Sequence, residues 1–457
     1  MTPEPIAAFM AGLFDGPMPG RVRLLDAGAG EGSLTAAFIA RWTGSPIEAH
    51  AYECDPAIAA RLQTTLHRLA DQAGSAPQVL MEDFVQAAAR MARLGQGPRY
   101  THAILNPPYR KIGNGSQHRA LLRAVGLETV NLYSGFVGLA LELLAPGGRL
   151  VAIIPRSFCN GPYYQPFRSF MLRRAAIRHL HLFTARDAVF RRNGVLQENV
   201  IISLERGADQ GPVTVSTSTD DSFADYESRP CPAGTILPLH NPGCFIHIPT
   251  EALAEQFDGS GPFRFRLVEL GIDVSTGPVV DFRLRDNLRP MPEPGAVPLL
   301  YSSHFSAGGI RWPIAGIKKP NAIVHTQATA KYLYPNGFYA VVRRFSSKEE
   351  KRRIVAAVVD PGDVLGAALG FENHLNVFHR RRTPLSEPIA RGLVAYLSTT
   401  AVDRYFRQFN GHTQVNATDL RTLRFPDIEA LTQLGEWAKA HRDAPQDAID
   451  RQVQTMA

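Results

Sequence analysis

The chain of 457 residues has few cysteines and no long hydrophobic run. Its four cysteines are scattered, so they form neither a CxxC metal-binding motif nor a disulfide framework. No stretch approaches the length of a transmembrane helix, and residues 1–14 lack the basic start and long apolar core of a signal peptide. These absences predict a cytoplasmic protein with no metal site and no membrane partner.

The excess of positive charge is confined to the second half of the chain. The net charge is +7, and residues 261–425 contain 23 Lys and Arg against 13 Asp and Glu. Residues 426–457 are acidic, with 3 Lys and Arg against 6 Asp and Glu, so residues 1–260 are neutral overall. A basic second half favours a polyanionic partner such as nucleic acid. A solvated basic face without a partner is the alternative interpretation.

Residues 21–205 alternate between apolar, strand-like runs and helix-like segments. This alternation predicts an α/β fold in which a parallel sheet is doubly wound, with helices on both faces. The expected strands lie at residues 22–28, 47–55, 78–84, 102–106 and 149–158.

The pattern changes after the fifth expected strand. A polar stretch follows, for which we expect irregular structure and a domain boundary. Beyond it, short β-like runs mix with one strong helix expected at residues 348–360, which indicates a separate α+β domain. The sequence therefore predicts a catalytic domain at 1–206, a boundary segment at 207–240, an α+β domain at 241–426 and a helical tail at 427–457.

A glycine-rich turn, LLDAGAGEGSL, follows the first expected strand. Gly28, Gly30 and Gly32 let the backbone approach a ligand closely. Asp26 and Glu31 would repel a pyrophosphate, and the GK[ST] of a phosphate-binding loop is missing. Acidic side chains suit a cation better, and S-adenosylmethionine carries both an ammonium and a sulfonium. The turn therefore predicts a site for S-adenosylmethionine.

Acidic residues also end the second and third expected strands. Glu53 is placed to accept hydrogen bonds from the ribose hydroxyls of a nucleoside, with Asp55 as the alternative. Asp83 could accept the exocyclic amine of the cofactor's adenine, and Phe84 could pack on its ring. Each acid alone could equally be a helix cap or a solvated loop residue. Together with the glycine turn, acids at successive strand ends favour a nucleoside site.

The fourth expected strand stops at Asn106-Pro107-Pro108-Tyr109, because two consecutive prolines cannot continue a strand or a helix. The exocyclic amine of adenine is a weak nucleophile, since its lone pair is delocalised into the ring. Two acceptors that hold both amine hydrogens would return this lone pair to nitrogen. We assign them to the Asn106 side-chain oxygen and the Pro107 carbonyl, which the prolines fix in place. A rigid turn without chemistry is the alternative.

An adenine inside a duplex has to be flipped out to reach such a pocket. Tyr109 offers a flat face on which an extruded base would stack. We expect a second aromatic side chain to close the pocket, and Phe190 is the candidate. The alternative for Phe190 is a place in the hydrophobic core.

The order of these motifs resembles the gamma-class adenine-N6 DNA methyltransferases of type II restriction–modification systems, with a TaqI-like architecture. TPEPIAAFMAGLF (2–14) is similar to the motif that precedes the glycine turn in that family, which implies that Thr2 and Pro3 lie beside the cofactor. FENHLNVFH (371–379) and GHTQVNATDLRTLRFP (411–426) resemble, more narrowly, the PstI/BsuBI-type enzymes.

This resemblance implies a Rossmann-like methyltransferase sheet that binds S-adenosylmethionine, followed by an α+β target-recognition domain. It also implies double-stranded DNA as the partner. By analogy alone, the recognition sequence is a palindrome such as CTGCAG.

Polar and basic side chains of the second domain fit contact with DNA. Those expected to neutralise phosphates are Arg343, Arg344, Lys348, Lys351, Arg352 and Arg353. Those expected to read base edges are Asn373, His374, Asn376, His379, Gln414 and Asn416. For residues 371–379, a helix with capped or buried polar side chains is the alternative.

Other functions stay open at this point. Methyltransferases of RNA adenine or protein glutamine also use an NPPY motif, but the large basic second domain favours DNA. A non-catalytic DNA-binding specificity subunit is disfavoured by the intact NPPY motif and acids. No PD…ExK-like set indicates a nuclease in the same chain. The sequence does not reveal the oligomeric state or whether a separate cognate restriction endonuclease exists.

Overall fold

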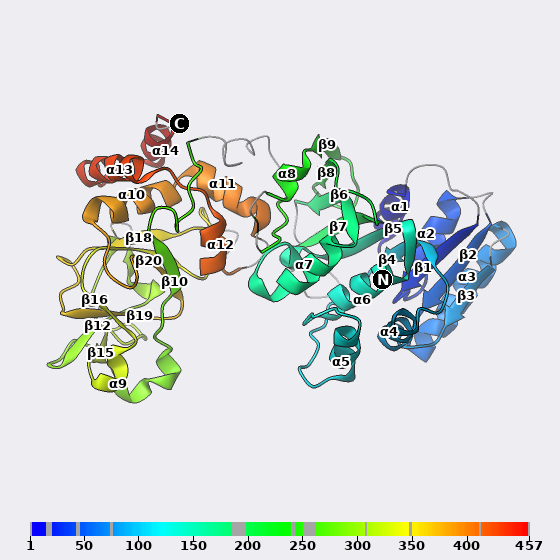
Figure 1. Cartoon of the computed structure of the whole chain (residues 1–457), viewed down its shortest axis with the longest axis horizontal. Helices are drawn as coiled ribbons and strands as arrows, with labels where there is room; N and C mark the ends of the chain where they lie inside the picture. The colour runs from blue at the N-terminus through cyan, green and yellow to red at the C-terminus, as the bar shows by residue number, and fades with distance from the viewer. Residues whose placement is uncertain are drawn as a thin grey trace. The chain divides into compact units, whose positions relative to one another are not determined.

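The computed structural model describes residues 2–14, 21–42, 46–73, 76–184, 198–238, 241, 243–249, 262–306, 309–346, 350–410 and 413–455. The chain divides into two compact units, Met1–Thr250 and Glu251–Ala457. The first unit contains a sheet of nine strands, and the second contains smaller sheets with a group of helices (Figure 1).

The sheet of the first unit has the strand order β3-β2-β1-β4-β5-β7-β6-β8-β9. The first five of these strands are parallel, and β7 joins β5 in the antiparallel direction. The strand order reverses between β1 and β4, which is where open α/β sheets bind ligands. The five predicted strands are confirmed as β1 (Val22–Ala27), β2 (Ile47–Tyr52), β3 (Ala76–Leu80), β4 (Tyr100–Leu105) and β5 (Leu144–Pro155).

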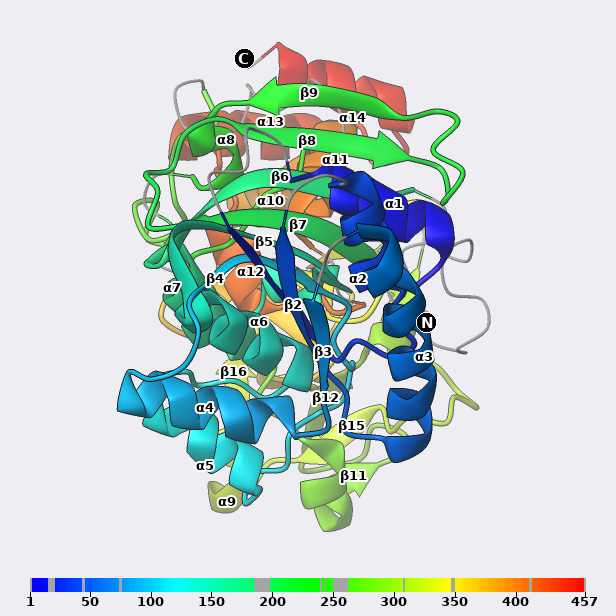
Figure 2. The same ribbon diagram turned by 90° about the vertical axis from the view of Figure 1, so that its right-hand side faces the viewer.

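Helices cover both faces of this sheet, as the doubly wound prediction requires. Neighbouring residues of one strand face opposite sides, so Leu24 packs with α1 and α2 while Leu25 packs with α4 and α6. Figure 2 shows α1, α2 and α3 on one side of the strands and α4, α6 and α7 on the other. The helices are α1 (Glu4–Gly12), α2 (Ser33–Arg41), α3 (Pro56–Ala73), α4 (Phe84–Leu94), α5 (Gln117–Ala124), α6 (Leu132–Leu143) and α7 (Gln165–Leu172).

The stretch 207–240 differs from the irregular boundary that its polar composition predicts. It carries β8 (Val213–Ser218) and β9 (Glu227–Cys231), which extend the sheet beyond β6 (Ala175–Phe183) and β7 (Asn199–Arg206). A short helix, α8 (Ala233–Ile236), follows. The polar side chains of β8 and β9 fit strands near a sheet edge, where one face is less deeply covered than in the centre. The division between the two units falls instead at Thr250 and Glu251.

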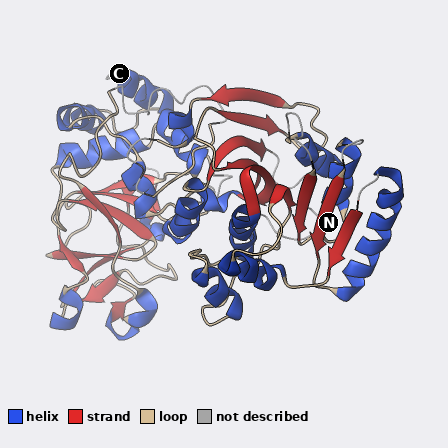
Figure 3. Cartoon of the chain, turned by 45° about the vertical axis from the view of Figure 1, so that its right-hand side comes forward, coloured by secondary structure: helices blue, strands red, loops and turns tan. Residues whose placement is uncertain are grey.

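The second unit combines two main sheets with five helices near its C-terminal end among the described residues (Figure 3). The four-stranded sheet has the order β10 (Asp273–Thr276), β20 (Leu375–His379), β17 (Tyr339–Arg343) and β18 (Ala356–Val359). The five-stranded sheet has the order β11 (Leu288–Arg289), β15 (Ala322–Val324), β12 (Ala296–Leu300), β19 (Ala368–Phe371) and β16 (Leu333–Pro335). Between β19 and β20 lies the polar part of FENHLNVFH, so this segment is not a helix.

The helix expected at residues 348–360 is a second difference from the sequence prediction. Residues 347–349 lie outside the described part, and the apolar end of the segment forms β18, which pairs with β17. Val358 and Val359 are β-branched, and this side-chain shape suits a strand that packs on a neighbour. Tertiary pairing therefore outweighs the helix-forming residues that precede them.

The acidic tail, predicted as one or two closing helices, forms α13 (Ile428–Ala440) and α14 (Gln446–Gln454). They accompany α10 (Glu387–Leu397), α11 (Thr400–Phe409) and α12 (Ala417–Thr422). α13 packs closely on α10 because each helix has a glycine at the crossing. A Cβ on Gly392 would overlap the Leu431 carbonyl, and a Cβ on Gly435 would overlap the Pro388 carbonyl. The tail is thus an integral part of the second unit.

Candidate active site

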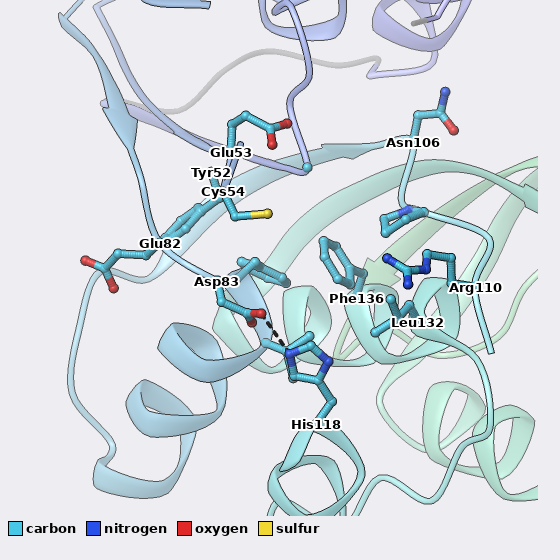
Figure 4. A pocket seen from close by; sticks show the side chains of 14 residues that line it. Tyr52, Glu53, Cys54, Glu82, Asp83, Asn106, Arg110, His118, Leu132 and Phe136 are labelled. Carbon is cyan, nitrogen blue, oxygen red and sulfur yellow. Dashed lines mark hydrogen bonds and ion pairs between the residues drawn. The ribbon is translucent and has the colours of Figure 1, made fainter. Parts of the chain in front are cut away.

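A cavity of about 400 Å³ lies at the carboxyl ends of β1, β2, β3 and β4 (Figure 4). This is the edge of the sheet where the strand order reverses, so the topology alone favours a ligand site here. The lining residues are Gly28, Tyr52, Glu53, Cys54, Glu82, Asp83, Phe84, Val85, Asn106, Pro108, Arg110, His118, Leu132 and Phe136.

The glycine turn forms one wall of the cavity. Gly28, Gly30 and Gly32 all have positive φ, at 74°, 58° and 89°, a conformation that other residues adopt only with strain. Gly28 lines the cavity, and a Cβ there would lie 3.5 Å from the Phe136 ring. Gly32 begins α2, and a Cβ there would lie 2.7 Å from Leu62. The glycines therefore shape the turn, and Gly28 alone of the three borders the cavity.

Asp26 and Glu31 do not face the cavity, which differs from the prediction that both carboxylates meet a cationic cofactor. Asp26 is fully buried and accepts a hydrogen bond of 2.7 Å from the Thr35 hydroxyl on α2. Burial raises the pKa of Asp26 from 3.8 to about 7. Glu31 forms an ion pair of 3.1 Å with Arg61 on α3. Asp26 thus connects β1 to α2, and Glu31 connects the turn to α3.

Glu53 lies at the cavity and also supports the glycine turn. Its Oε2 accepts a hydrogen bond of 3.1 Å from the Gly30 N–H, and its Oε1 accepts one of 2.9 Å from the Asp55 N–H. Each carboxylate oxygen keeps further lone pairs for a ligand. Asp55 instead caps α3 by accepting from the Ala57 N–H at 2.9 Å, and it does not line the cavity. The geometry thus favours Glu53 over Asp55 as the residue that contacts a nucleoside.

Asp83 stands at the opposite side of the cavity and holds two partners. Its Oδ1 caps α4 by accepting from the Gln86 N–H at 3.0 Å, and its Oδ2 lies 2.7 Å from His118 Nε2 on α5 (Figure 4). Phe84 follows it and packs against Phe136, with ring centroids 5.0 Å apart. Carboxylates that accept hydrogen bonds and aromatic rings therefore line one cavity, and this combination fits the hydroxyls, amine and ring of an adenosine group.

The NPPY motif lies at the edge of the same cavity. The Asn106 side-chain N–H donates a hydrogen bond of 2.9 Å to the Thr2 hydroxyl, which fixes the orientation of the amide. The Tyr109 hydroxyl donates to the Ile153 carbonyl on β5 at 3.1 Å and lies 3.4 Å from Asn106 Oδ1. Thr2 is buried against the Asn106 amide and does not line the cavity, although the resemblance predicts it beside the cofactor.

Tyr109 is anchored at its hydroxyl and braced at its ring. Burial raises the pKa of its hydroxyl above the ordinary value of 10, so this group remains a proton donor to the Ile153 carbonyl. Tyr133 on α6 meets the ring edge to face, with centroids 6.1 Å apart. The ring is half-buried and held at its tip, so its position is fixed.

Several cavity residues were not predicted from the sequence, among them Phe136, His118 and Arg110. Phe136 belongs to the apolar helix α6, where nothing distinguishes it from a core residue. His118 and Arg110 lie in the segment after NPPY, which lacks a recognisable pattern. For His118 and Arg110, the sequence feature that could have indicated a place at the cavity is their closeness to NPPY, because the segment after NPPY runs back across the same edge of the sheet.

Curated relatives match nearly the full length of the chain. M.BsuBI of Bacillus subtilis, a type II methyltransferase, is 49% identical over 447 residues, covering 95% of this chain and 89% of the relative. M.PstI of Providencia stuartii, also a type II methyltransferase, is 42% identical over 445 residues, covering 95% and 88%. The chain belongs to this family of type II methyltransferases.

The family model of the Eco57I restriction–modification methylase matches residues 74–190, which include the NPPY motif. Among solved structures, the Type IIL restriction–modification enzyme MmeI in complex with DNA has a TM-score of 0.53 and 12% identity, covering 95% of this chain and 70% of that one. The Type ISP enzyme LlaGI has a TM-score of 0.53 and 11% identity, covering 97% and 54%. At this identity the two structures support the fold alone.

The second unit of this type II methyltransferase brings several predicted DNA-contacting residues together. The Arg344 N–H donates to the His374 carbonyl at 2.8 Å, and the Arg344 guanidinium donates to the Asn373 carbonyl at 3.2 Å. Gln414 belongs to a third segment, which bridges to the residue after Arg344. Asn416 in that segment is the N-cap of α12. Parts of the chain up to 70 residues apart thus meet at one place.

Other predicted phosphate contacts are exposed to different degrees. Lys351 is exposed. Arg343 is paired with Glu350 at 3.2 Å, and Arg352 donates to the Thr400 hydroxyl at 2.8 Å. A phosphate would therefore have to compete with these partners at Arg343 and Arg352.

Three predicted contacts have structural roles in place of DNA contact. Arg353 is 1% exposed, and its guanidinium donates to Ser346 and Asn410. Asn376 is fully buried and donates to a backbone carbonyl of the third segment at 2.7 Å. His379 is 5% exposed and lies 2.8 Å from a serine hydroxyl on β10. A polar residue in a basic domain is as readily an interior hydrogen-bond donor as a surface contact, and sequence alone cannot distinguish the two.

Two predicted site residues, Phe190 and Lys348, lie outside the described residues. Within the described ranges, no group of three or more His, Cys, Asp or Glu side chains is arranged to hold a metal ion. In that same part of the chain, no helix is both long enough and apolar enough to cross a bilayer.

Proposed function

We propose that this protein transfers a methyl group from S-adenosylmethionine to the exocyclic N6 of an adenine that is flipped out of duplex DNA, within a specific sequence. The observation that carries the proposal is the Asn106 amide, oriented by Thr2, at the edge of the cavity that Glu53 and Asp83 line. Its role in the cell would be the modification half of a restriction–modification system, which is what the description of the matching family model names.

The cavity residues fit the parts of S-adenosylmethionine. Glu53 would accept hydrogen bonds from the ribose hydroxyls, and Asp83 would accept one from the adenine amine. Phe84 and Phe136 would pack on the adenine ring. When bound, the cofactor supplies a methyl group that its sulfonium makes electrophilic. His118 would hold the Asp83 carboxylate in place through their 2.7 Å contact.

Asn106 and Pro107 would activate the target amine. The Asn106 N–H₂ is engaged by Thr2, so Oδ1 is the amide atom that can accept one hydrogen of the target amine. The Pro107 carbonyl would accept the other hydrogen, since the following proline holds it in an extended geometry. Together they pull the amine out of the ring plane and return its lone pair to nitrogen. The extra proton can leave to solvent after transfer, so no general base is required beforehand.

Tyr109 would stack on the flipped base while its hydroxyl stays bound to the Ile153 carbonyl. A ring anchored at its tip loses little further entropy when a base stacks on it. Moving the target adenine from the duplex into the pocket costs a few kcal/mol, because the base loses its stacking in the duplex. Stacking on the fixed Tyr109 ring would offset part of this cost.

DNA is favoured over RNA adenine or protein glutamine as the substrate by the family of the relatives. A non-catalytic specificity subunit would have no need for the Thr2–Asn106–Tyr109 arrangement. The experiment that tests the proposal incubates purified protein with S-adenosylmethionine and unmethylated genomic DNA, and maps modified bases by long-read sequencing. We expect N6-methyladenine at one short sequence, and that sequence also reveals the specificity.

Asn106→Ala should reduce methyl transfer by at least about 100- to 1,000-fold, the usual cost of one lost preorganised contact, while DNA binding is retained. Gln433→Ala, at an exposed amide on α13, is the matched control and should leave transfer unchanged. Methylcytosine as the product, methylation of RNA or protein in place of DNA, or full activity of Asn106→Ala would each refute the proposal.

A further inference from the structure

In the second unit, an exposed histidine ring is fixed by a fully buried carboxylate. The Glu372 side chain has no exposed surface, whereas 45% of the His374 side chain is exposed. His374 Nδ1 lies 2.6 Å from Glu372 Oε1, and the His374 backbone N–H donates to Oε2 at 2.9 Å. Both oxygens of one carboxylate therefore hold the same residue, which fixes the position and plane of the ring.

This contact also determines which ring nitrogen faces outward as an acceptor. A carboxylate only accepts hydrogen bonds, so the ring carries a hydrogen on Nδ1, toward Glu372. In the neutral form of the ring, Nε2 then keeps its lone pair on the opposite side. No hydrogen bond to Nε2 is formed within the described part of the chain. Glu372 thus presents His374 to solvent as a hydrogen-bond acceptor, in the manner of a carboxylate that orients a metal-binding histidine.

The surroundings of His374 fit a nucleic acid surface. The Phe345 ring lies 5.1 Å from the His374 ring and is 40% exposed, which is unusual for so large an apolar side chain. Arg344 is bound to the backbone of both Asn373 and His374. An aromatic ring interleaved with basic side chains is typical of surfaces that meet nucleic acid.

We propose that His374 reads one base pair of the recognition sequence by accepting, at Nε2, a hydrogen bond from an exocyclic amine in the major groove. Glu372 is the positioning residue that fixes the ring and its tautomer. The amines that donate in this groove are N4 of cytosine and N6 of adenine. The inference rests on the proposed function, because it requires a DNA substrate with a defined sequence.

The test measures kcat/KM on short duplexes that carry the mapped recognition sequence, with one base pair changed at a time. His374→Ala should lower discrimination about 10-fold at a single C·G or A·T pair and leave the other positions unchanged. Glu372→Gln keeps the side-chain volume, but its single oxygen cannot serve both His374 donors. The ring tautomer is then no longer selected, so discrimination should fall about 3-fold at the same base pair.

A double variant separates positioning from a general structural role. If Glu372 acts through the ring, Glu372→Gln should have no further effect on discrimination in the His374→Ala background. Two matched controls in the same unit should leave discrimination unchanged at every position. They are His441→Ala, at an exposed histidine stacked on Trp437, and Asp450→Asn, at a half-buried carboxylate that accepts from the Thr400 N–H.

The outcomes are distinguishable from failure of the proposed function. If the wild-type protein methylates no DNA, the proposed function is wrong and this inference falls with it. If the wild-type protein methylates its sequence but His374→Ala lowers kcat/KM equally on all duplexes, the ring contacts the backbone and the inference is wrong. The same holds if His374→Ala lowers discrimination at no base pair of the recognition sequence.

Discussion

In the first unit the candidate site residues follow the ends of parallel strands, whereas in the second unit they lie where three distant segments meet. Glu53 and Asp83 occupy equivalent places after β2 and β3, and the sheet alone brings them to one cavity. Arg344 and His374 come together only because β17 and β20 pair and a third segment crosses beside them.

The difference lies in how much each site depends on backbone geometry. At the strand ends, backbone N–H groups bind the carboxylates of Glu53 and Asp83, so the turns and helix starts that follow the strands hold these side chains. In the second unit, side chains and local turns fix the surface, which leaves it freer to vary without loss of the fold. Under the proposed function, the chemistry would belong to the first unit and the sequence preference to the second, two parts of the molecule with different structural constraints.

The largest expected effect is on the pH dependence of stability. It tests whether Asp26 is a buried structural acid, unlike the acids that line the cavity. Its pKa of about 7 lies above the ordinary 3.8, so the folded chain holds a proton there that the unfolded chain has lost. Between about pH 4 and pH 7, the contribution of Asp26 to the free energy of unfolding should therefore fall as pH rises, by an amount on the order of 4 kcal/mol, and level off above pH 7. Urea unfolding across this range measures it.

Asp26→Asn is the variant that isolates this contribution, because an amide does not titrate. Its free energy of unfolding should fall less than that of the wild-type protein as pH rises from about 5 to about 8. If the free energy of unfolding changes with pH in the same way in both proteins, the pKa of Asp26 is not raised by burial. Asp26 would then not differ from the cavity acids as described above.

The next effect tests whether the tail is part of the second unit. Gly435→Ala places a Cβ against the Pro388 carbonyl, so α13 has to move away from α10. We expect the free energy of unfolding to decrease by about 3 kcal/mol. The fluorescence of Trp437, on the same helix, monitors unfolding. Gly234→Ala in α8 has open space around its new Cβ and should be neutral. Equal melting temperatures for Gly435→Ala and the wild-type protein would contradict the close packing of the two helices.

A third prediction compares the acids inside and outside the cavity. Glu53→Gln and Asp83→Asn should each raise the Kd for S-adenosylmethionine about 10-fold, since each removes an acceptor for a cofactor donor. Glu31→Gln should change it less than about 2-fold, because Glu31 is paired with Arg61 away from the cavity. Calorimetric titration measures all three. A large effect at Glu31 would restore the prediction made from the sequence.

The contrast between the units also explains what the sequence could predict. The order of β1 to β5 and the residues after each strand follow from hydrophobic pattern and topology, which is why Glu53, Asp83 and Asn106 reach one cavity as predicted. Phe136 could not be predicted, because an apolar residue on a buried helix has the same pattern in a core and in a pocket wall. Asp26 was expected at the cavity but lies away from it, because the sequence does not show in which direction the side chain of an acid at a strand end points.

In the second unit the sequence named polar and basic residues as DNA contacts but did not reveal which of them are exposed. His374 is exposed and Asn376 is fully buried, although they are two residues apart in the same polar run. Their exposure is set by the turn between β19 and β20, which belong to different sheets, and the sequence did not distinguish these two strands from a helix. The role of Glu372 in orienting His374 could not be predicted from the sequence. The two residues are neighbours in any conformation of the chain, and the burial of Glu372 depends on strands that are distant in sequence.

The smallest expected effect returns to the first unit and tests how tightly its catalytic amide is fixed. Thr2→Val keeps the shape of the side chain but removes the hydroxyl that accepts from the Asn106 N–H₂. The amide can then rotate, and its buried donor loses a partner, at a cost of about 1 kcal/mol. We expect kcat to fall about 5-fold with the KM for DNA unchanged, and Thr2→Ser to restore it. If Thr2→Val instead raises the Kd for S-adenosylmethionine and spares kcat, Thr2 acts on the cofactor, as the resemblance implies, and the amide is held by the NPPY backbone alone.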